Sequence, residues 1–220
     1  MSERSEMSTG EEVSTGKRSY SNSLRKQQSD LTRELILRAL NELVAENRIL
    51  TLTVEDVAEK AGVSHRSVYR HFPTKEALFE ALYKSNEEIM DPFKALGPPA
   101  SIDEIPALAV KVFANFDEHS VVARSLNIAS IVSGVQPPTR EERDALIKNL
   151  LVDVTSNLDK TEARRAFAVI RYMLGALAWH TLRDRFKLDG ADAGKAVSWA
   201  LAVLIKDLRD RNTEAERASK

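Results

Sequence analysis

Residues 53–75 carry helix start and stop signals at such short spacing that they permit only short helices joined by a tight turn. Thr53-Val-Glu-Asp56 has the form of a capping box, in which the first and fourth residues bind each other's backbone N–H groups. Gly62 can take the left-handed conformation that ends a helix sharply, and Ser64 can cap the next helix at once. Pro73 stops that second helix, and Thr74 caps another. The pattern predicts a helix-turn-helix over residues 53–72.

The second of these helices has one apolar and one polar face. At helical spacing, its inward side carries Val63, Val68 and Phe72, and its outward side carries His65, Arg66, Tyr69 and Arg70. Between Gly62 and Lys75 there are three cations and no acid, although the whole chain of 220 residues has a formal net charge of -1. Such a local positive patch predicts DNA contact, because arginine pairs with guanine in the major groove and Tyr and His suit phosphate oxygens.

Lys75 lies in the first turn of the following helix, where the helix dipole disfavours a cation. A phosphate bound at this helix end would remove the conflict. The neighbouring Glu76 could also compensate the charge, so both interpretations remain open.

The same region resembles the DNA-binding signature of the TetR family of bacterial regulators. The residues that carry the resemblance are Thr53-Val-Glu-Asp-Val-Ala-Glu-Lys-Ala-Gly-Val-Ser-His-Arg-Ser-Val-Tyr-Arg-His-Phe-Pro-Thr-Lys-Glu-Ala-Leu-Phe79. They contain the Thr-Val start, the Val-Ala pair, Ala-Gly-Val-Ser, Tyr-x-His-Phe and Lys-x-x-Leu that recur together in that family. The chain departs from the pattern at Ser67-Val68, where Thr-Leu is usual, and at Asn47-Arg48, where the first helix ends without a glycine.

The resemblance implies roles for individual side chains. Positions that usually hold phosphates carry Tyr69, His71 and Lys75, and Thr53 lies at the helix end that abuts the DNA backbone. Positions that usually read bases carry His65, Arg66 and Arg70, with Ser64 and Ser67 beside them. The role of His71 rests on the resemblance alone, because this residue falls off the central outward face.

Apolar residues elsewhere recur at helical spacing, with no alternating strand pattern. Expected helices cover about 31–46, 74–90, 103–118, 120–132, 139–158, 161–186 and 189–210, and the clearest linker is residues 91–100. We therefore expect an all-α protein. An N-terminal three-helix helix-turn-helix DNA-binding domain would cover residues 29–90, and a helical ligand-binding and dimerisation domain would cover residues 101–210.

Both ends of the chain are polar. Residues 1–28 hold too few apolar side chains to offset the entropy of ordering, so we expect a disordered tail there, and a polar tail over 211–220. The basic residues Lys17, Arg18, Arg25 and Lys26 suggest a second possibility, an arm that touches DNA.

The second domain is expected to form a homodimer. The helices over 161–186 and 189–210 are apolar on two faces, so one face can pack within the domain and the other on a second copy. Candidate contacts for a small-molecule effector are the aromatic, sulfur-containing and polar residues Phe113, Phe116, Arg124, Asn127, Tyr172, Met173, Trp179 and His180.

Several classes of function lack support in the sequence. No cysteine is present, and His119 and His180 have no second histidine at ligand spacing, so neither a metal site nor a cofactor is expected. No phosphate loop, serine elbow or paired-carboxylate motif occurs, so no catalytic residue is expected. The longest apolar run, Tyr172–Trp179, is far shorter than the roughly 20 residues of a membrane span. With no secretory signal, the protein is expected in the cytoplasm and not at a membrane.

The sequence thus predicts a sequence-specific transcriptional regulator, a dimeric repressor that a small molecule releases from a palindromic operator. One alternative is an activator or a ligand-independent regulator that uses the same DNA site. A remote alternative is a helical enzyme or scaffold.

Overall fold

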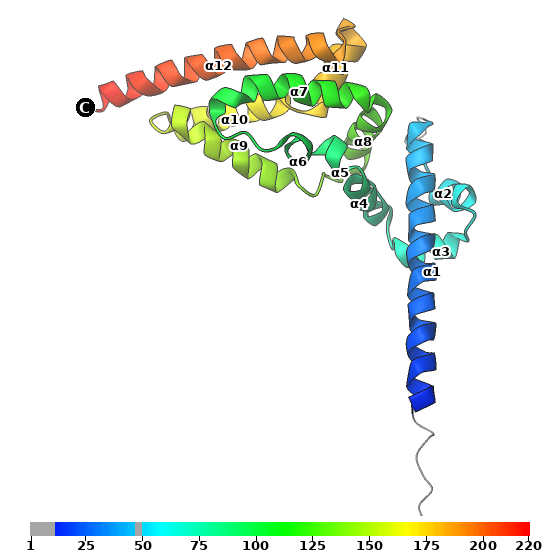
Figure 1. Cartoon of the computed structure of the whole chain (residues 1–220). Helices are drawn as coiled ribbons and strands as arrows, with labels where there is room; N and C mark the ends of the chain where they lie inside the picture. Colours follow the sequence, from blue (N-terminus) through cyan, green and yellow to red (C-terminus); the bar gives the residue numbers. More distant parts are fainter. Residues whose placement is uncertain (1–11, 47–49) are drawn as a thin grey trace, which may run out of the picture.

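The computed structural model describes residues 12–46 and 50–220. Over these residues it contains twelve α-helices, one 3-10 helix and no strand, which confirms the all-α class. The N-terminal part consists of α1 (Glu12–Ala45), α2 (Val54–Ala61), α3 (His65–His71) and α4 (Lys75–Ser85). In Figure 1, α2 and α3 lie against one side of the long α1, and α4 leads from them towards the rest of the molecule.

The C-terminal part begins with short elements and continues with long helices. Its elements are α5 (Glu87–Met90), α6 (Pro92–Leu96), η1 (Ile102–Glu104), α7 (Ile105–Glu118), α8 (Ser120–Ser133), α9 (Arg140–Thr155), α10 (Lys160–Met173), α11 (Ala176–Phe186) and α12 (Gly190–Ala218). Helices α7 and α12 pack along one another (Figure 1). Gly190 makes this close approach possible, because a Cβ atom there would lie 2.5 Å from the Cβ of Asp117.

Each of the two parts has its own hydrophobic core, and α8 contributes residues to both cores. Leu126 and Ala129 of α8 are buried in the core of the N-terminal part, whereas Ala123 belongs to the C-terminal core. Tyr83 of α4 donates a hydrogen bond to the Leu126 carbonyl at 2.6 Å, and burial raises the pKa of Tyr83 to about 12. A rearrangement of the C-terminal core would therefore reach α4 through α8.

The N-terminal limit of the ordered chain differs from the prediction. Helix α1 begins at Glu12, whereas we expected disorder throughout residues 1–28; residues 1–11 lie outside the described part. Side chains 23–30 are all exposed, so backbone hydrogen bonds support this extension of the helix. Lengthening an existing helix by one residue costs much less free energy than starting a new helix. Arg25 and Lys26 lie exposed on α1, and the side chains of Lys17 and Arg18 lie outside the described part.

The C-terminal limit also differs. Helix α12 continues to Ala218 and replaces the expected polar tail over 211–220. Two polar contacts fix its last turns: the backbone N–H of Asn157 donates to Asn212 Oδ1 at 2.7 Å, and Arg211 pairs with Glu162 at 2.7 Å. The sequence pattern does not reveal this end of the helix, because the partners that fix it are about 50 residues away along the chain.

Some internal boundaries differ as well. The single helix expected over 161–186 is two helices, α10 and α11, which meet at Leu174 and Gly175. Helix α4 ends at Ser85 rather than near residue 90, and Pro92 begins the short helix α6 within the expected linker. Thr139 precedes α9 without a side-chain cap hydrogen bond.

Candidate functional site

The turn between α2 and α3 is built by local hydrogen bonds that the sequence predicted. The Thr53 side chain accepts from the backbone N–H of Asp56 at 3.1 Å, and the Thr53 N–H donates to Asp56 Oδ2 at 2.9 Å. Gly62 takes the left-handed conformation, with φ of 67°. Ser64 then accepts from the backbone N–H of Ser67 at 3.1 Å. The expected capping box, glycine stop and serine cap are confirmed.

Helix α3 buries one face and exposes the other. Val68 is 1% exposed and Phe72, at the helix end, is 4% exposed. The exposed side carries His65, Arg66, Tyr69 and Arg70, as the helical spacing predicted. Among residues 62–75 no acid faces this surface, so the local charge is positive.

Neighbouring residues orient part of this exposed side. His65 Nε2 lies 3.0 Å from Glu55 Oε1 on α2, and the His65 ring packs edge-on against Tyr69, with ring centroids 4.7 Å apart. The hydroxyls of Ser64 and Ser67 lie 2.9 Å apart. Arg66 and Arg70 have no hydrogen bond or ion pair within the described chain, so their guanidinium groups are free to bind an external partner.

Lys75 begins α4 next to the same surface. Its ammonium donates to the Leu52 carbonyl at 3.0 Å and lies 5.6 Å from the centre of the Phe79 ring. A backbone carbonyl thus receives one of its three N–H groups, an interaction that neither interpretation of Lys75 anticipated. The other two N–H groups remain available to a phosphate.

His71 lies at the end of α3 and is partly buried, and its buried Nε2 atom has no hydrogen-bond partner among the residues that the structure describes. Burial lowers the pKa of His71 below its usual value of 6.5, and the charges of Arg70 and Arg33 act in the same direction, against the opposing effect of Asp30. This ring is therefore neutral at neutral pH and would gain a proton more readily beside a phosphate.

We expect His71 to titrate below pH 6.5 in the folded protein and near 6.5 in the unfolded chain. Because the unfolded chain then binds the proton more tightly, the contribution of His71 to stability is fully present above about pH 6.5 and is lost as the pH falls below that value. Histidine NMR titration of the whole chain measures this pKa, and a bound duplex should raise it if a phosphate contacts the ring. A pKa at or above 6.5 without DNA would contradict the prediction.

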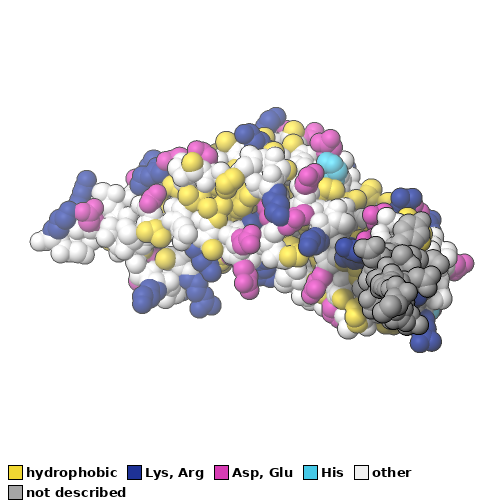
Figure 2. All heavy atoms as spheres, turned by 60° about the horizontal axis from the view of Figure 1, so that its bottom comes forward, with side chains coloured by type: hydrophobic (Ala, Val, Ile, Leu, Met, Phe, Trp, Pro, Cys, Tyr) yellow, Lys and Arg dark blue, Asp and Glu magenta, His cyan; other side chains and the backbone are white. Residues whose placement is uncertain are grey.

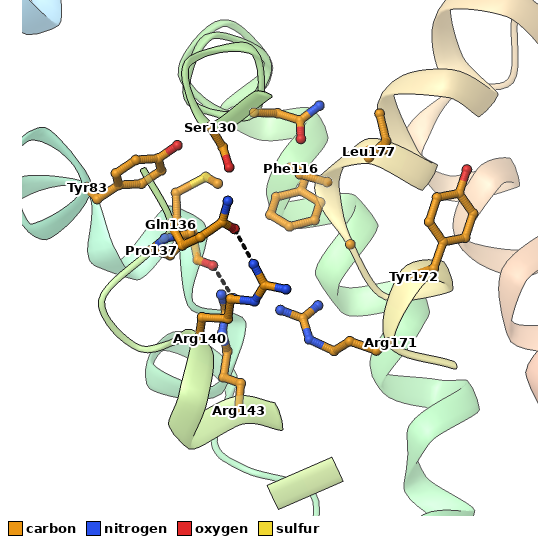
Figure 3. Close-up of a pocket in the computed structure, with 14 residues that line it drawn as sticks. Tyr83, Phe116, Ser130, Gln136, Pro137, Arg140, Arg143, Arg171, Tyr172 and Leu177 are labelled. Atoms are coloured by element: carbon orange, nitrogen blue, oxygen red, sulfur yellow. Dashed lines mark hydrogen bonds between the residues drawn. The ribbon is translucent and has the colours of Figure 1, made fainter. Parts of the chain in front are cut away.

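A cavity of about 250 Å³ lies between α4 and the C-terminal helices (Figure 3). It is lined by Tyr83, Met90, Phe116, Asn127, Ser130, Gln136, Pro137, Arg140, Arg143, Arg171, Tyr172, Gly175, Ala176 and Leu177. Three of the predicted ligand contacts, Phe116, Asn127 and Tyr172, are among these residues. The cavity therefore brings residues of α4, α5, α7, α8, α9, α10 and α11 together.

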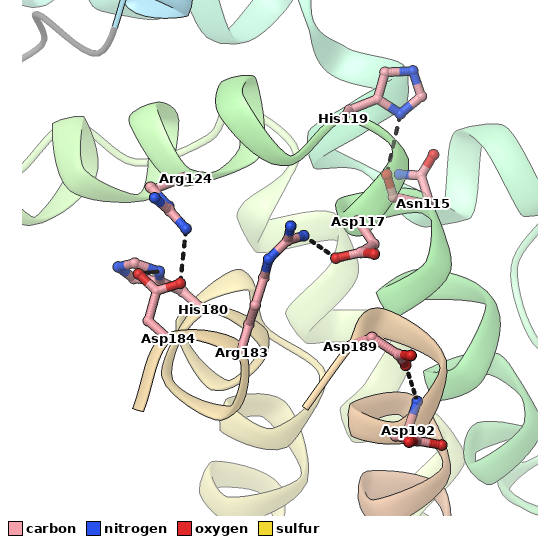
Figure 4. Close-up of polar contacts among 9 residues, drawn as sticks. All are labelled: Asn115, Asp117, His119, Arg124, His180, Arg183, Asp184, Asp189 and Asp192. Atoms are coloured by element: carbon pink, nitrogen blue, oxygen red, sulfur yellow. Dashed lines mark hydrogen bonds and ion pairs between the residues drawn. The ribbon is translucent and has the colours of Figure 1, made fainter. Parts of the chain in front are cut away.

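The other predicted ligand contacts lie elsewhere. Phe113 and Trp179 are fully buried in the C-terminal core, and Met173 lines a separate apolar groove of about 330 Å³ together with Tyr172. Arg124 and His180 both face Asp184, at 2.7 Å and 3.2 Å (Figure 4). Neither residue lines the cavity, and the sequence pattern did not reveal their partner because Asp184 is distant along the chain from Arg124.

His119 is not positioned to bind a metal. Its Nδ1 atom lies 3.1 Å from the Asn115 carbonyl (Figure 4). Over residues 12–46 and 50–220, no group of three or more His, Asp or Glu side chains is arranged to hold a metal ion. Within the same residues, no helix is both long enough and apolar enough to cross a membrane.

The sequence analysis missed the three arginines of the cavity. Arg140 and Arg143 lie on α9 and Arg171 on α10, and in Figure 3 the side chains of Arg140 and Arg171 point towards each other. Of the three arginines, only Arg143 could have been singled out from the sequence. It is a charged residue that lies one helical turn before Ile147, on the side of α9 that is buried.

Comparison with known proteins agrees with the geometry of α2 and α3. Residues 36–82 match the model described as bacterial regulatory proteins, tetR family. The nucleoid occlusion factor SlmA of Marinobacter nauticus is 43% identical over 56 residues, which are 26% of this chain and 29% of that protein. SlmA of Vibrio cholerae is 42% identical over 57 residues, with the same shares covered.

The chain thus spans about 29% of the length of these curated relatives, and the likeness is confined to the region of the DNA-binding part. The match covers the end of α1, the whole of α2 and α3 and most of α4, and these are the elements whose caps and turn are described above. Residues 36–82 thus form a helix-turn-helix domain of the kind found in bacterial regulatory proteins of the tetR family.

Proposed function

We propose that this protein is a homodimeric transcriptional regulator of the bacterial cytoplasm, a repressor that a small molecule releases from a palindromic operator. The observation that carries the proposal is the exposed side of α3, which presents Arg66 and Arg70 without internal partners. An α-helix of this kind fits the major groove, where arginine can form two hydrogen bonds with guanine. The family match over residues 36–82 supports DNA as the partner and sets the enzyme alternative aside.

Each predicted site residue has an expected role at the DNA. His65, Arg66 and Arg70 would read bases, with Ser64 and Ser67 beside them, and Thr53, Tyr69, His71 and Lys75 would hold phosphates. Phosphate contacts position a protein on any duplex, whereas base contacts distinguish one sequence from another. Substitutions of the base-reading residues and of the phosphate-binding residues should therefore affect DNA binding in different ways.

We expect Arg66→Ala or Arg70→Ala to weaken binding to the preferred duplex by about 1–3 kcal/mol and to relax discrimination at particular base pairs. Tyr69→Phe and Lys75→Ala should instead weaken binding to all duplexes alike, and Lys75→Ala should flatten the salt dependence. Fluorescence anisotropy with a duplex selected from a random pool, and with a scrambled duplex, measures both effects.

Lys148→Ala is a matched control, because Lys148 is an exposed cation on α9 whose ammonium packs over Phe167 at 4.8 Å. It should bind both duplexes like the parent protein. Equal losses on both duplexes for Arg66→Ala and Arg70→Ala would refute their assignment as base readers.

Dimerisation is supported by apolar side chains that the single chain leaves exposed. On α10, α11 and α12 these are Val169, Tyr172, Phe186, Trp199 and Val203, with exposed fractions between 48% and 72%. Figure 2 shows apolar side chains gathered over part of the C-terminal region, on the left, between charged side chains of both signs. A second copy could cover these apolar side chains in a two-fold dimer. Dimeric helix-turn-helix proteins bind two half-sites about 34 Å apart, and we expect the same spacing of the two recognition helices here.

Control by a small molecule is supported by the position of the cavity. Tyr83 of α4 lines it, and α4 follows the recognition helix directly, so a ligand that prefers one arrangement of these helices would change DNA affinity. An activator would use the same DNA site and the same cavity. The SlmA relatives are named for nucleoid occlusion, but their likeness to this chain is confined to the region of the DNA-binding part and supports DNA binding only.

A further inference from the structure

The cavity of Figure 3 is unusual in holding three guanidinium groups. Arg140 and Arg143 of α9 and Arg171 of α10 all line it. Asp144 accepts from Arg171 Nε at 2.6 Å and lies 3.7 Å from Arg140 Nε. Gln136 accepts a hydrogen bond from Arg140 at 2.6 Å. The Asp144 carboxylate and the neutral Gln136 amide thus interact with two of the three arginines, Arg140 and Arg171.

The side chain of Arg143 is left without a carboxylate in direct contact. Arg143 is 9% exposed, and the only hydrogen bond of its guanidinium group within the described chain runs to the Met90 carbonyl at 2.6 Å. Its Nε–H group is buried and donates to nothing in the described chain. A buried cation without a paired anion is costly, so the fold holds a positive charge here that an anion would stabilise.

The electrostatics of Arg143 agree with this geometry. Burial and, after it, the nearby charge of Arg171 lower the pKa of Arg143 to about 10, against the opposing effects of Asp91 and Asp144. The side chain still carries its proton at neutral pH. Asp91 is itself buried, and its Oδ1 accepts from the backbone N–H of Phe93 at 3.1 Å.

The rest of the cavity wall is suited to an apolar body with one polar end. Met90, Phe116 and Leu177 supply apolar surface, and the Nδ2 atom of Asn127 is a buried donor that has no partner over residues 12–46 and 50–220. A volume of about 250 Å³ lies just below the range of about 300–1,000 Å³ that is usual for drug-sized ligands, so the occupant must be compact.

We propose that this cavity binds a small organic carboxylate, with its charged end at Arg143 and Arg171 and its apolar body against Phe116 and Leu177. A carboxylate matches the planar fork of an arginine with two parallel hydrogen bonds. A single negative charge also suits the site, because Asp144 already compensates part of the charge of the three arginines.

The position of Arg143 gives the ligand a route to the DNA-binding part. The Arg143 side chain holds the Met90 carbonyl at the end of α5, and α5 follows α4 after one residue. A carboxylate that draws the guanidinium towards the cavity would compete with this hydrogen bond. The regulatory consequence rests on the proposed function, whereas binding of the carboxylate does not.

The test uses the full chain and matched pairs of probes. Sodium benzoate, phenylacetate and hexanoate are compared with benzamide, phenylacetamide and hexanamide by calorimetry and thermal unfolding, at constant ionic strength. We expect at least one carboxylate to bind with one site per chain and to raise the melting temperature, and its amide to do neither. The inference is overturned if no carboxylate binds, if the amides bind equally well, or if inorganic phosphate alone binds.

Variants locate the site. Arg143→Met and Arg171→Gln should each weaken the binding of that carboxylate about tenfold or more, the usual effect of losing a hydrogen bond to a charged group. Arg217→Gln, at the exposed end of α12, is the matched control and should bind like the parent protein. If the Arg143→Met protein does not fold, the binding measured with Arg171→Gln decides whether the carboxylate occupies this cavity. Unchanged binding in Arg171→Gln, or an equal loss in Arg217→Gln, overturns the placement.

DNA binding is measured separately, by anisotropy without any carboxylate. A chain that binds DNA but none of the carboxylates refutes this inference and leaves the regulator intact. A chain that binds a carboxylate through Arg171 but binds no DNA supports the inference and refutes the proposed function.

Discussion

Replacing Val203 by glutamate should separate the proposed dimer without unfolding the chain, and operator binding should fall on the order of a hundredfold or more. Val203 is 54% exposed on α12, so a single folded chain tolerates a carboxylate there. In a two-fold dimer the same face is covered by its own copy, and two unpaired carboxylates would lose their hydration together. A cost of about 3 kcal/mol corresponds to roughly a hundredfold change in an equilibrium constant.

The matched control is Val152→Glu. Val152 is also 54% exposed, but it lies on α9, outside the apolar face of α10, α11 and α12. Sedimentation velocity reports the oligomeric state, circular dichroism reports helicity, and anisotropy reports operator affinity. We expect the control to remain dimeric and to bind the operator normally.

If the Val203→Glu protein remains dimeric, the interface does not include this face of α12. The same conclusion follows if Val203→Glu and Val152→Glu dissociate the dimer equally. An effector should act differently from this substitution. It should release the operator while the dimer persists, because its proposed task is to change the spacing of the recognition helices. Parallel loss of dimer and operator on adding the effector would instead favour control through the oligomeric state.

Trp179→Ala should produce the largest loss of stability among single substitutions in the C-terminal core, about 3–5 kcal/mol. Trp179 is fully buried, and its ring centre lies 5.8 Å from that of Phe116, which lines the cavity. Removing the ring would leave a void that the surrounding helices can only partly fill. Within the described chain the buried indole N–H has no hydrogen-bond partner, so no hydrogen bond is lost with the ring.

Urea denaturation followed by circular dichroism measures this effect, at one protein concentration for all variants because dimerisation would shift the midpoint. Trp179→Phe keeps an aromatic ring and should cost clearly less. Ile131→Ala is the control for removing a large apolar side chain that is 63% exposed, and it should change stability by no more than about 0.5 kcal/mol. A cost below about 1 kcal/mol for Trp179→Ala would mean that the core closes around the missing ring.

The sequence by itself determined the helix-turn-helix and its exposed face. Thr53, Gly62, Ser64 and Thr74 act on backbone groups within four residues of themselves, so their effect can be deduced without knowledge of the fold. The two faces of α3 follow from helical spacing in the same way. The family signature over this segment contains the same capping and turn residues, together with the charges that we propose face DNA.

Only the tertiary structure decided the cavity, because its wall comes from seven helices and from residues as far apart as Tyr83 and Leu177. Arg124 and His180 could be polar contacts of a ligand by sequence, but Asp184 holds both of them. Arg143 became a candidate when its burial and missing carboxylate partner were known. The free energy of a charged group depends on what surrounds it in space, and neighbours along the chain determine only a small part of those surroundings.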